Sequence, residues 1–458
     1  MTQFDDFDKL LKEKAQGDKC TIPSNLNDKI NNILKNLPEK RAPKKMKLKV
    51  MLIAAAIAAM SITTVFAGGA PHIKKLTNDF VSYFKGTENC KYDSDMPLFN
   101  TFNSSIGASI TDKNIKFTVD NIAADDNFIN IFYTIESKTP INMNFTDENE
   151  LFKAFLSAPF LDLKINGKNT TIGNHNDIDA YFKSPKVLKV MKRFNVSQSD
   201  LPVKFNLEIS AKEIFNTKGN WSILTSVDKS NIKVKSTTVK PDIKASIKLG
   251  KYKHKINIDK VCISPFSSQI VISEHVKDNN LFDTFALYDD KGRVLDVLNT
   301  DETTASNLFK TTNSFEFIKA KEDTKSITLV PINFTEKGKA KIEKAKIKNL
   351  PISIKTCNTG SRVIDKIEFN KNVIRISYHN DGVVLWDPAF IFYDKNDNEL
   401  NFDFGENTSV NRATGEFTQT LESSNKNEDF SKISEIGTFT GNENLDLLKD
   451  QGIKIKLK

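Results

Sequence analysis

The sequence predicts a mainly β protein with tandem Ig-like β-sandwich modules outside the cell, one transmembrane helix and a short α-helical cytoplasmic tail. A single long stretch without charged residues, Val50 to Ala70, divides the chain. Apolar residues recur at helical spacing before it, whereas short segments after it alternate apolar and polar residues, as half-buried strands do. We therefore expect a cytoplasmic helical tail over 1–47, the transmembrane helix over 48–70, and β domains over 71–235, 236–357 and 358–458.

The uncharged stretch has the length of a membrane-spanning helix. At roughly 1.5 Å of rise per residue, residues 50–67 would extend about 27 Å, close to the ~30 Å hydrocarbon core of a bilayer. Two alternatives stay open, since Val65-Phe66-Ala67 resembles a signal-peptide cleavage site and the alanine-rich composition also suits a buried helix. A signal peptide begins near the N-terminus, whereas 49 residues precede this stretch. The sequence thus favours an uncleaved span.

Basic residues gather on the N-terminal side of this stretch. The formal net charge of the chain is +8, and more than half of it lies before Val50. The positive-inside rule therefore places the N-terminus in the cytoplasm and the C-terminal bulk outside the cell membrane. The same side chains would contact anionic headgroups of the lipid bilayer. The predicted membrane-flanking residues are Arg41, Lys44, Lys45, Lys47 and Lys49.

The tail is expected to contain an amphipathic helix with an uncovered apolar face. The helix is expected to begin after Ser24, a favourable N-cap, and to end before Pro38. A tail of this size cannot bury that face by itself, so the face would either enter a groove of a partner protein or lie on the inner membrane surface, unless the tail is simply disordered. The predicted partner-binding residues are Leu26, Ile30, Ile33, Leu34 and Leu37.

A weak internal repeat predicts the outer modules. Each copy has a strand with an aspartate after an apolar pair, a short loop and a second alternating strand, and the copies cover 115–135, 255–273 and 361–378. Their spacing fits β-sandwiches of Ig-like size. The segments KAKIKNLPI and GIKIKLK would supply the last strands of the second and third modules. Trp221 would anchor the core of the first module.

Catalytic and metal-binding motifs are not recognisable in the sequence. The histidines stand alone and are better explained as surface or core residues than as ligands. We therefore expect neither an enzyme nor a cofactor, and we expect no nucleic-acid partner because no basic stripe marks the outer part. Three segments rich in Asp, Asn and Gly are interpreted as turns: Asp125 to Asn127, Asp289 to Gly292, and Asp394 to Glu399, which imitates the start of a calcium loop. The histidines are His72, His175, His254, His275 and His379.

The layout resembles a known family. The segment from Ile22 to Ile30, the lysine-rich linker, the alanine-rich span and the strand-rich part from Ile106 are similar to those of Gram-positive membrane proteins with a DUF-type ectodomain, regarded as anti-sigma-factor-like. The resemblance covers roughly 20–230, and a second ectodomain module of the family would cover about 240–355. This chain departs from many anti-sigma domains, because residues 1–49 hold one cysteine, Cys20, and no histidine for a zinc site.

The resemblance implies a single-pass membrane regulator. Its outer modules would sense an unknown envelope ligand or stress, and its tail would hold a cytoplasmic sigma factor until proteolysis or a conformational change releases it. The alternative is a structural or adhesive envelope protein whose tail only anchors it. A disulfide among Cys90, Cys262 and Cys357 is left open by the sequence.

Overall fold

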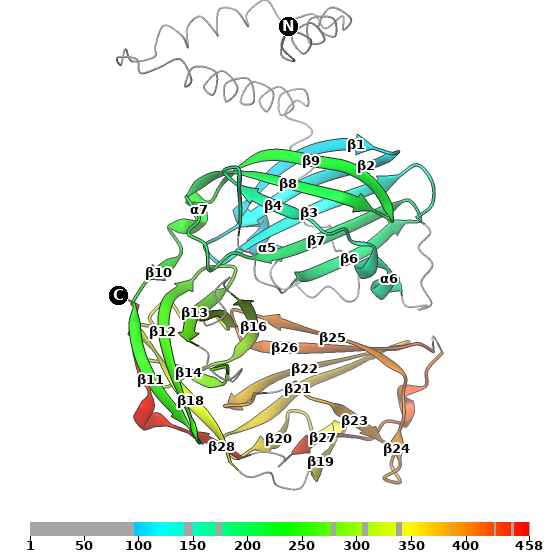
Figure 1. Ribbon diagram of the computed structural model, residues 1–458. Helices are drawn as coiled ribbons and strands as arrows, with labels where there is room; N and C mark the ends of the chain where they lie inside the picture. Colours follow the sequence, from blue (N-terminus) through cyan, green and yellow to red (C-terminus); the bar gives the residue numbers. More distant parts are fainter. Residues whose placement is uncertain are drawn as a thin grey trace, which may run out of the picture. The chain divides into compact units, whose positions relative to one another are not determined.

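The computed structural model describes the β-rich part of the chain (Figure 1). None of the helices in this part is both long and apolar enough to cross a membrane. The predicted tail and the predicted span from Val50 to Ala70 lie outside the described residues. All described residues fall within one compact unit. They are 96–141, 150–170, 176–275, 281–304, 310–335, 341–385, 387–425, 427–440 and 444–457.

Antiparallel strands make up most of the regular structure, so the prediction of a mainly β protein is confirmed. Short helical segments lie between them. Within the described ranges the α-helices are α5 (Met96–Phe102), α6 (Glu150–Ser157) and α7 (Ser230–Lys233), and the 3₁₀ turns are η2 (Ile347–Asn349), η3 (Phe430–Lys432) and η4 (Lys449–Gln451).

The first sandwich packs two sheets around one core. Its strands are β1 (Asn103–Asp112), β2 (Ile115–Ala124), β3 (Phe128–Ser137), β4 (Asp162–Ile165), β5 (Lys168–Asn169), β6 (Asn176–Ser184), β7 (Val187–Asn195), β8 (Lys204–Ile214) and β9 (Thr217–Asp228). One sheet has the order β1-β2-β3-β7-β6 and the other β5-β4-β8-β9. Trp221 is fully buried between them, as predicted, and its Nε1 donates to the Ile115 carbonyl oxygen at 2.9 Å.

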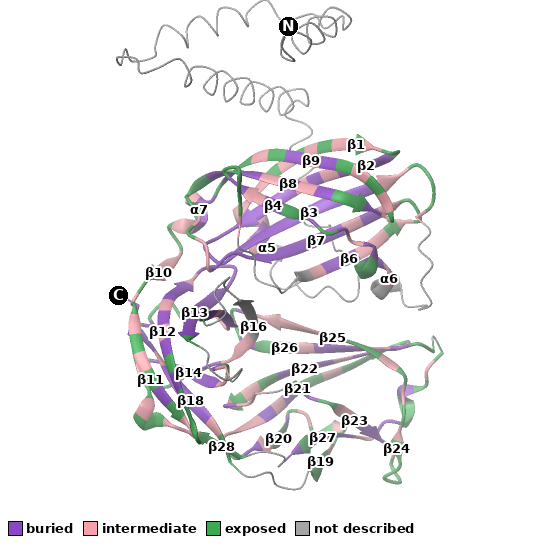
Figure 2. Ribbon diagram, in the orientation of Figure 1, coloured by how far each residue is buried: buried purple, intermediate pink, exposed green. Residues whose placement is uncertain are grey.

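Strands β3 and β7 are buried along most of their length (Figure 2). One side of them faces the core of the first sandwich. On the other side Phe132 and Met191 pack with Phe99 of α5, Ile232 of α7 and Phe266, which lies in the second sandwich. This apolar cluster therefore attaches the first sandwich to the second.

The second sandwich repeats the strand order of the first. Its strands are β10 (Thr237–Val239), β11 (Ile243–Leu249), β12 (Tyr252–Ile263), β13 (Ser268–His275), β14 (Phe285–Asp289), β15 (Val294–Leu295), β16 (Val297–Thr304), β17 (Lys310–Phe317) and β18 (Ser326–Thr335). The hairpin β12–β13 pairs with β17 and then β16, as β2–β3 pairs with β7 and then β6. Strands β14, β15 and β18 form the facing sheet, and the two sheets enclose a separate core.

The third sandwich follows the same plan. Its strands are β20 (Ile352–Cys357), β21 (Gly360–Asn370), β22 (Val373–Gly382), β23 (Phe390–Tyr393), β24 (Glu399–Leu400), β25 (Phe404–Asn411), β26 (Glu416–Ser423) and β27 (Glu435–Thr440). Here β21–β22 pairs with β26 and then β25, and β23, β24 and β27 face them across a third core.

The second and third sandwiches exchange strands. Strand β19 (Lys341–Lys346) follows β18 in the chain but pairs with β27 of the third sandwich. Strands β28 (Asn444–Leu447) and β29 (Ile453–Lys456) follow β27 but pair with β18 of the second. The prediction that KAKIKNLPI and GIKIKLK close their own modules is therefore wrong. Their alternation marks them as strands, but nothing in it selects between two similar sheet edges.

The repeated aspartate occupies the same β-bulge in all three sandwiches. The pairing register shifts at Asp120 between β2 and β3, at Asp259 between β12 and β13, and at Asp365 between β21 and β22. A bulge inserts one unpaired residue and increases the local twist of the strand. The internal repeat read from the sequence thus corresponds to a repeated structural unit.

Candidate functional site

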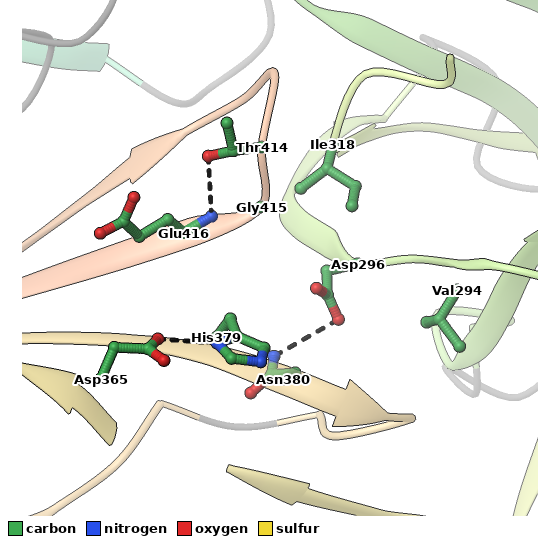
Figure 3. A pocket seen from close by; sticks show the side chains of 9 residues that line it. All are labelled: Val294, Asp296, Ile318, Asp365, His379, Asn380, Thr414, Gly415 and Glu416. Atoms are coloured by element: carbon green, nitrogen blue, oxygen red, sulfur yellow. Dashed lines mark hydrogen bonds and ion pairs between the residues drawn. The ribbon is translucent and has the colours of Figure 1, made fainter. Parts of the chain in front are cut away.

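A cleft of about 410 Å³ lies between the second and third sandwiches (Figure 3). The second sandwich contributes β15, Asp296 directly after it, and Ile318 directly after β17. The third sandwich contributes β21, β22 and the β25–β26 turn. The volume falls in the range of small-molecule sites. The lining residues are Val294, Asp296, Ile318, Asp365, His379, Asn380, Thr414, Gly415 and Glu416.

Asp296 is a partly buried carboxyl group that no cation contacts among the described residues. It accepts one hydrogen bond, from Asn380 Nδ2, at a long 3.3 Å. Burial raises the pKa of Asp296 to about 6, and the Asn380 bond and the more distant charges of Arg362 and His379 oppose this only in part. The ionised carboxylate would therefore be stabilised by a positive charge placed in the cleft.

Other residues with hydrogen-bond acceptors line the same space. Asn380 Oδ1 is buried and has no partner within the described part of the chain. The Glu416 side chain is exposed, and only its backbone N–H is bonded here, to Thr414 Oγ1 at 3.3 Å. His379 Nδ1 lies 2.7 Å from Asp365 Oδ2, so this carboxylate has a partner. Because lysine and arginine are missing from the lining, acceptors outnumber donors.

The carboxyl groups of the cleft are not arranged as a metal centre. Across the described ranges, no three His, Cys, Asp or Glu side chains come close enough to share an ion. Two aliphatic side chains, Val294 and Ile318, complete the wall on the side of the second sandwich. The cleft is therefore suited to an organic molecule rather than to a bare metal ion.

A buried ion triad next to the cleft joins all three sandwiches. Glu316 of β17 accepts two hydrogen bonds of 2.8 Å from Arg193 of β7 and one of 2.7 Å from Arg412 Nε in the β25–β26 turn. These side chains are 4% exposed or less. Burial alone would raise the pKa of Glu316, but the two guanidinium groups outweigh it and lower the pKa to about 2. Each charge in the triad is thus compensated by its neighbours.

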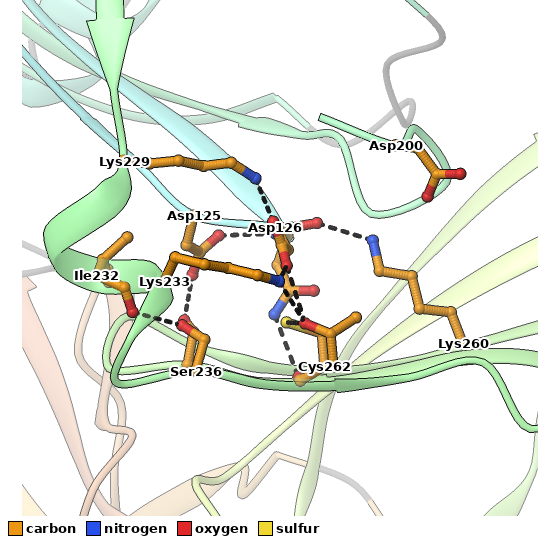
Figure 4. A network of polar contacts seen from close by, with 12 residues as sticks. Asp125, Asp126, Asp200, Lys229, Ile232, Lys233, Ser236, Lys260 and Cys262 are labelled. Atoms are coloured by element: carbon orange, nitrogen blue, oxygen red, sulfur yellow. Dashed lines mark hydrogen bonds and ion pairs between the residues drawn. The ribbon is translucent and has the colours of Figure 1, made fainter. Parts of the chain in front are cut away.

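A second charged cluster joins the first and second sandwiches (Figure 4). Asp126, in the β2–β3 turn, forms ion pairs with Lys229 and with Lys233, the latter at 2.5 Å. Burial opposes ionisation, but the two lysines lower the pKa of Asp126. Lys260 of β12 donates to the backbone carbonyl oxygens of Asp126 at 3.0 Å and Ser197 at 2.8 Å. The cluster satisfies its own charges and therefore acts as a structural joint.

The predicted turns are confirmed. Asp394 Oδ1 accepts the backbone N–H groups of Asn396 at 2.8 Å and Asn398 at 2.9 Å, which closes the turn between β23 and β24. Asp289 Oδ1 accepts the N–H of Lys291 at 2.9 Å between β14 and β15. The turn at Asp125 to Asn127 lies between β2 and β3, although its role in the joint was not predicted.

The histidines and cysteines have different surroundings. His254 is buried with its Nδ1 3.3 Å from Glu274 Oε2, so the prediction of a core residue fits it, whereas His379 lines the cleft. Cys262 and Cys357 are buried and free. His72, His175, Cys20 and Cys90 lie outside the described residues.

The site residues named from the sequence are not among those that the structure describes. The predicted partner-binding residues are Leu26, Ile30, Ile33, Leu34 and Leu37, and the predicted membrane-flanking residues are Arg41, Lys44, Lys45, Lys47 and Lys49. Both sets stay predictions. Asp296, Asn380 and the triad were missed, because each acquires its environment from a segment more than 80 residues away.

Two segments match families of unknown function. Residues 43–137 match a domain of unknown function, DUF4179, and residues 236–355 match a family of unknown function, DUF5643. None of the curated proteins matches the chain. A solved structure, the crystal structure of the conserved domain protein from Bacillus anthracis, covers 58% of this chain and 88% of its own at 16% identity and a TM-score of 0.39. The chain is thus similar to DUF-type proteins in two of its segments.

Proposed function

We propose that the chain is a single-pass membrane regulator of the anti-sigma-factor type. Three Ig-like sandwiches outside the cell would sense an envelope signal, and the cytoplasmic tail would bind a sigma factor through the apolar face from Leu26 to Leu37. The observation that carries the proposal is the buried contact of Glu316 with Arg193 and Arg412, which joins the three sandwiches at one point.

The triad supports transmission because it shares chain segments with the cleft. Ile318, in the cleft wall, follows Glu316 by two residues, and Thr414 follows Arg412 by two. The same segments are bonded to each other, since Lys319 N–H donates to the Arg412 carbonyl oxygen at 2.7 Å. A ligand that moves either segment would disturb a fully buried ion pair reaching the first sandwich. Close-packed elements respond to such a shift as a unit, which is how coupling between distant sites arises.

The extent of the first family match supports a link between membrane and sensor. It begins at residue 43 in the basic linker and ends at residue 137, the last residue of β3. One family unit thus includes the basic flank, the uncharged stretch and the central hairpin of the first sandwich. A cleaved signal peptide would not need to fall within the same family match as the sandwich, so the extent of the match supports an uncleaved span.

The test of partner binding uses the full chain in membranes of a Gram-positive host. After cross-linking and purification, we expect recovery of an extracytoplasmic-function sigma factor. Ile30→Asp places a charge on the apolar face and should reduce the recovery at least about tenfold. Asn32→Asp, on the opposite face, adds the same charge and should not. Recovery of lipid alone would support the structural or adhesive alternative instead.

The orientation can be tested by labelling intact cells with an impermeant maleimide. Because Cys262 and Cys357 are buried, Cys90 should be the outer cysteine that reacts. We expect Cys20 to react only after the cells are permeabilised. Labelling of Cys20 in intact cells would overturn the proposed orientation.

A further inference from the structure

The cleft between the second and third sandwiches has acceptors but no matching cation. The Asp296 carboxylate keeps its one hydrogen bond of 3.3 Å, and the Asn380 side chain that donates it has a buried Oδ1 without a donor among the described residues. Asp296 belongs to the second sandwich and Asn380 to the third, so the two side chains meet at the boundary between the sandwiches (Figure 3). A carboxylate with a single long hydrogen bond is poorly stabilised, so a ligand that donates to Asp296 would gain affinity.

We propose that this cleft binds a small aliphatic amine in its protonated form. An ammonium group carries three N–H donors and one positive charge. It would donate to the Asp296 carboxylate, while its alkyl part packs against Val294 and Ile318. A second ammonium group, in a diamine, would be attracted to the exposed carboxylates of Asp365 and Glu416.

Other ligand classes fit the lining less well. An anion would meet three carboxyl groups, from Asp296, Asp365 and Glu416, without a lysine or arginine in the wall. A metal ion would lack a converging set of ligands among the described residues. A neutral polyol could donate hydrogen bonds, but it would leave the charge of Asp296 uncompensated. Of these classes, the organic cation alone supplies both a positive charge and hydrogen-bond donors to the Asp296 carboxylate.

Binding of an amine to the cleft does not depend on the proposed function. Only the role of the amine as an envelope signal rests on it. The charged groups that face Asp296 are Arg362 and His379 on the third sandwich, and Asp365 and Glu416 line the same cleft. Because amine binding is measured without a sigma factor, its failure would leave the tail experiment untouched. Failure of the tail experiment would equally leave the cleft untouched.

The test is isothermal titration calorimetry of the full chain in detergent at pH 7.5. The probe is 1,5-diaminopentane, and 1,5-pentanediol is the neutral comparison. We expect measurable binding of the diamine, at least about tenfold tighter than that of the diol, and no binding of Ca²⁺ in the cleft. Asp296→Asn keeps the shape of the side chain and should weaken diamine binding at least about tenfold.

Two further variants keep the test decisive. Asp446→Asn, on the exposed face of β28, removes the same charge away from the cleft and should bind the diamine like the wild type. Glu416→Gln changes an exposed side chain that the fold does not need, and should weaken the diamine by about twofold to fivefold. Equal binding of diamine and diol, or diamine binding that both Asp296→Asn and Glu416→Gln leave unchanged, would overturn the proposal.

Discussion

The two boundaries between sandwiches are built differently. The first and second sandwiches are joined by side chains, with Lys260 donating to the backbone carbonyl oxygens of Asp126 and Ser197 and with Phe266 inserted into an apolar cluster. The second and third are joined by backbone, because β19, β28 and β29 cross over to the neighbouring sandwich. The first boundary has compensated charges, whereas the second contains a cleft with an uncompensated carboxyl group at Asp296.

This difference explains why a ligand site can exist at the second boundary. Where side chains hold two modules together, an unpaired charge would weaken the contacts between them. Where exchanged strands hold the modules together, the nearby side chains do not need to pair their charges and hydrogen bonds with each other. They can instead bind a ligand. At the second boundary, the exchanged strands thus join the modules and the side chains of the cleft are available for binding.

Breaking the triad should have the largest effect on stability. Glu316→Ala leaves the two guanidinium groups of Arg193 and Arg412 buried against each other, and we expect it to lower the free energy of unfolding by about 3–5 kcal/mol. Urea denaturation followed by tryptophan fluorescence measures this. The exposed Glu343→Ala on β19 is the matched control, for which we expect less than about 0.5 kcal/mol. Similar losses for the two variants would contradict the structural role of the triad.

The triad also predicts an acid transition. The pKa of Glu316 in the folded protein is about 2, below its ordinary value of 4.5. A lowered carboxyl pKa stabilises the fold fully above the ordinary value, and this contribution is lost as the pH falls from about 4.5 towards 2. Urea midpoints measured across this range should fall more steeply for the wild type than for Glu316→Gln. Parallel curves would show that Glu316 is not ionised in the fold.

A substitution in β29, after the third sandwich in the sequence, should destabilise the second sandwich, with which β29 pairs. Ile455 of β29 is fully buried in the core of the second sandwich, although the sequence of the third sandwich precedes it. We expect Ile455→Ala to lower the free energy of unfolding by about 2–4 kcal/mol. Hydrogen exchange should show the loss of protection in β18. Loss of protection in β27 without any in β18 would mean that the strands are not exchanged.

Removing the uncompensated charge should stabilise the protein. The pKa of Asp296 is raised to about 6, so its ionisation costs stability as the pH rises from about 4 through 6. Asp296→Asn should therefore be more stable than the wild type by roughly 1–3 kcal/mol at pH 8, and about equally stable below pH 4. Urea denaturation at both pH values gives the answer. A destabilised variant at pH 8 would show that a cation already balances Asp296.

An exposed ion pair should matter least. Lys116 and Glu136 lie 2.9 Å apart on neighbouring strands of the first sandwich, and both side chains are almost half exposed. We expect Lys116→Met to change the free energy of unfolding by less than about 0.5 kcal/mol, because solvent screens such pairs. A thermal melt at low and high salt checks this. A large effect would mean that exposure is a poor guide to which charges hold the modules together.

The sequence predicts local structure well, because local structure follows from side-chain periodicity. Alternation located the strands, Trp221 was recognised as a core residue, and the aspartate of the repeat corresponds to the bulges at Asp120, Asp259 and Asp365. These features depend on residues close together in the chain.

Features that depend on distant residues could not be predicted. The exchange of β19 and β29 needs a choice between two edges of similar sequence, which periodicity does not encode. The cleft depends on Asp296 meeting Asn380 across 84 residues, and neither residue type is unusual in a loop or strand. The predicted membrane span and partner-binding helix lie outside the described residues and await their own experiments.

The central claim is that the Asp296 carboxylate, at the boundary between the second and third sandwiches, binds an organic cation. It is tested most directly by calorimetric titration of 1,5-diaminopentane into the wild type and into Asp296→Asn between pH 5 and pH 7.5. We expect the affinity of the wild type to rise about tenfold over this range as Asp296 ionises, and that of the variant to rise much less. A wild-type affinity that does not change with pH, or a variant that follows the same curve, would contradict the account.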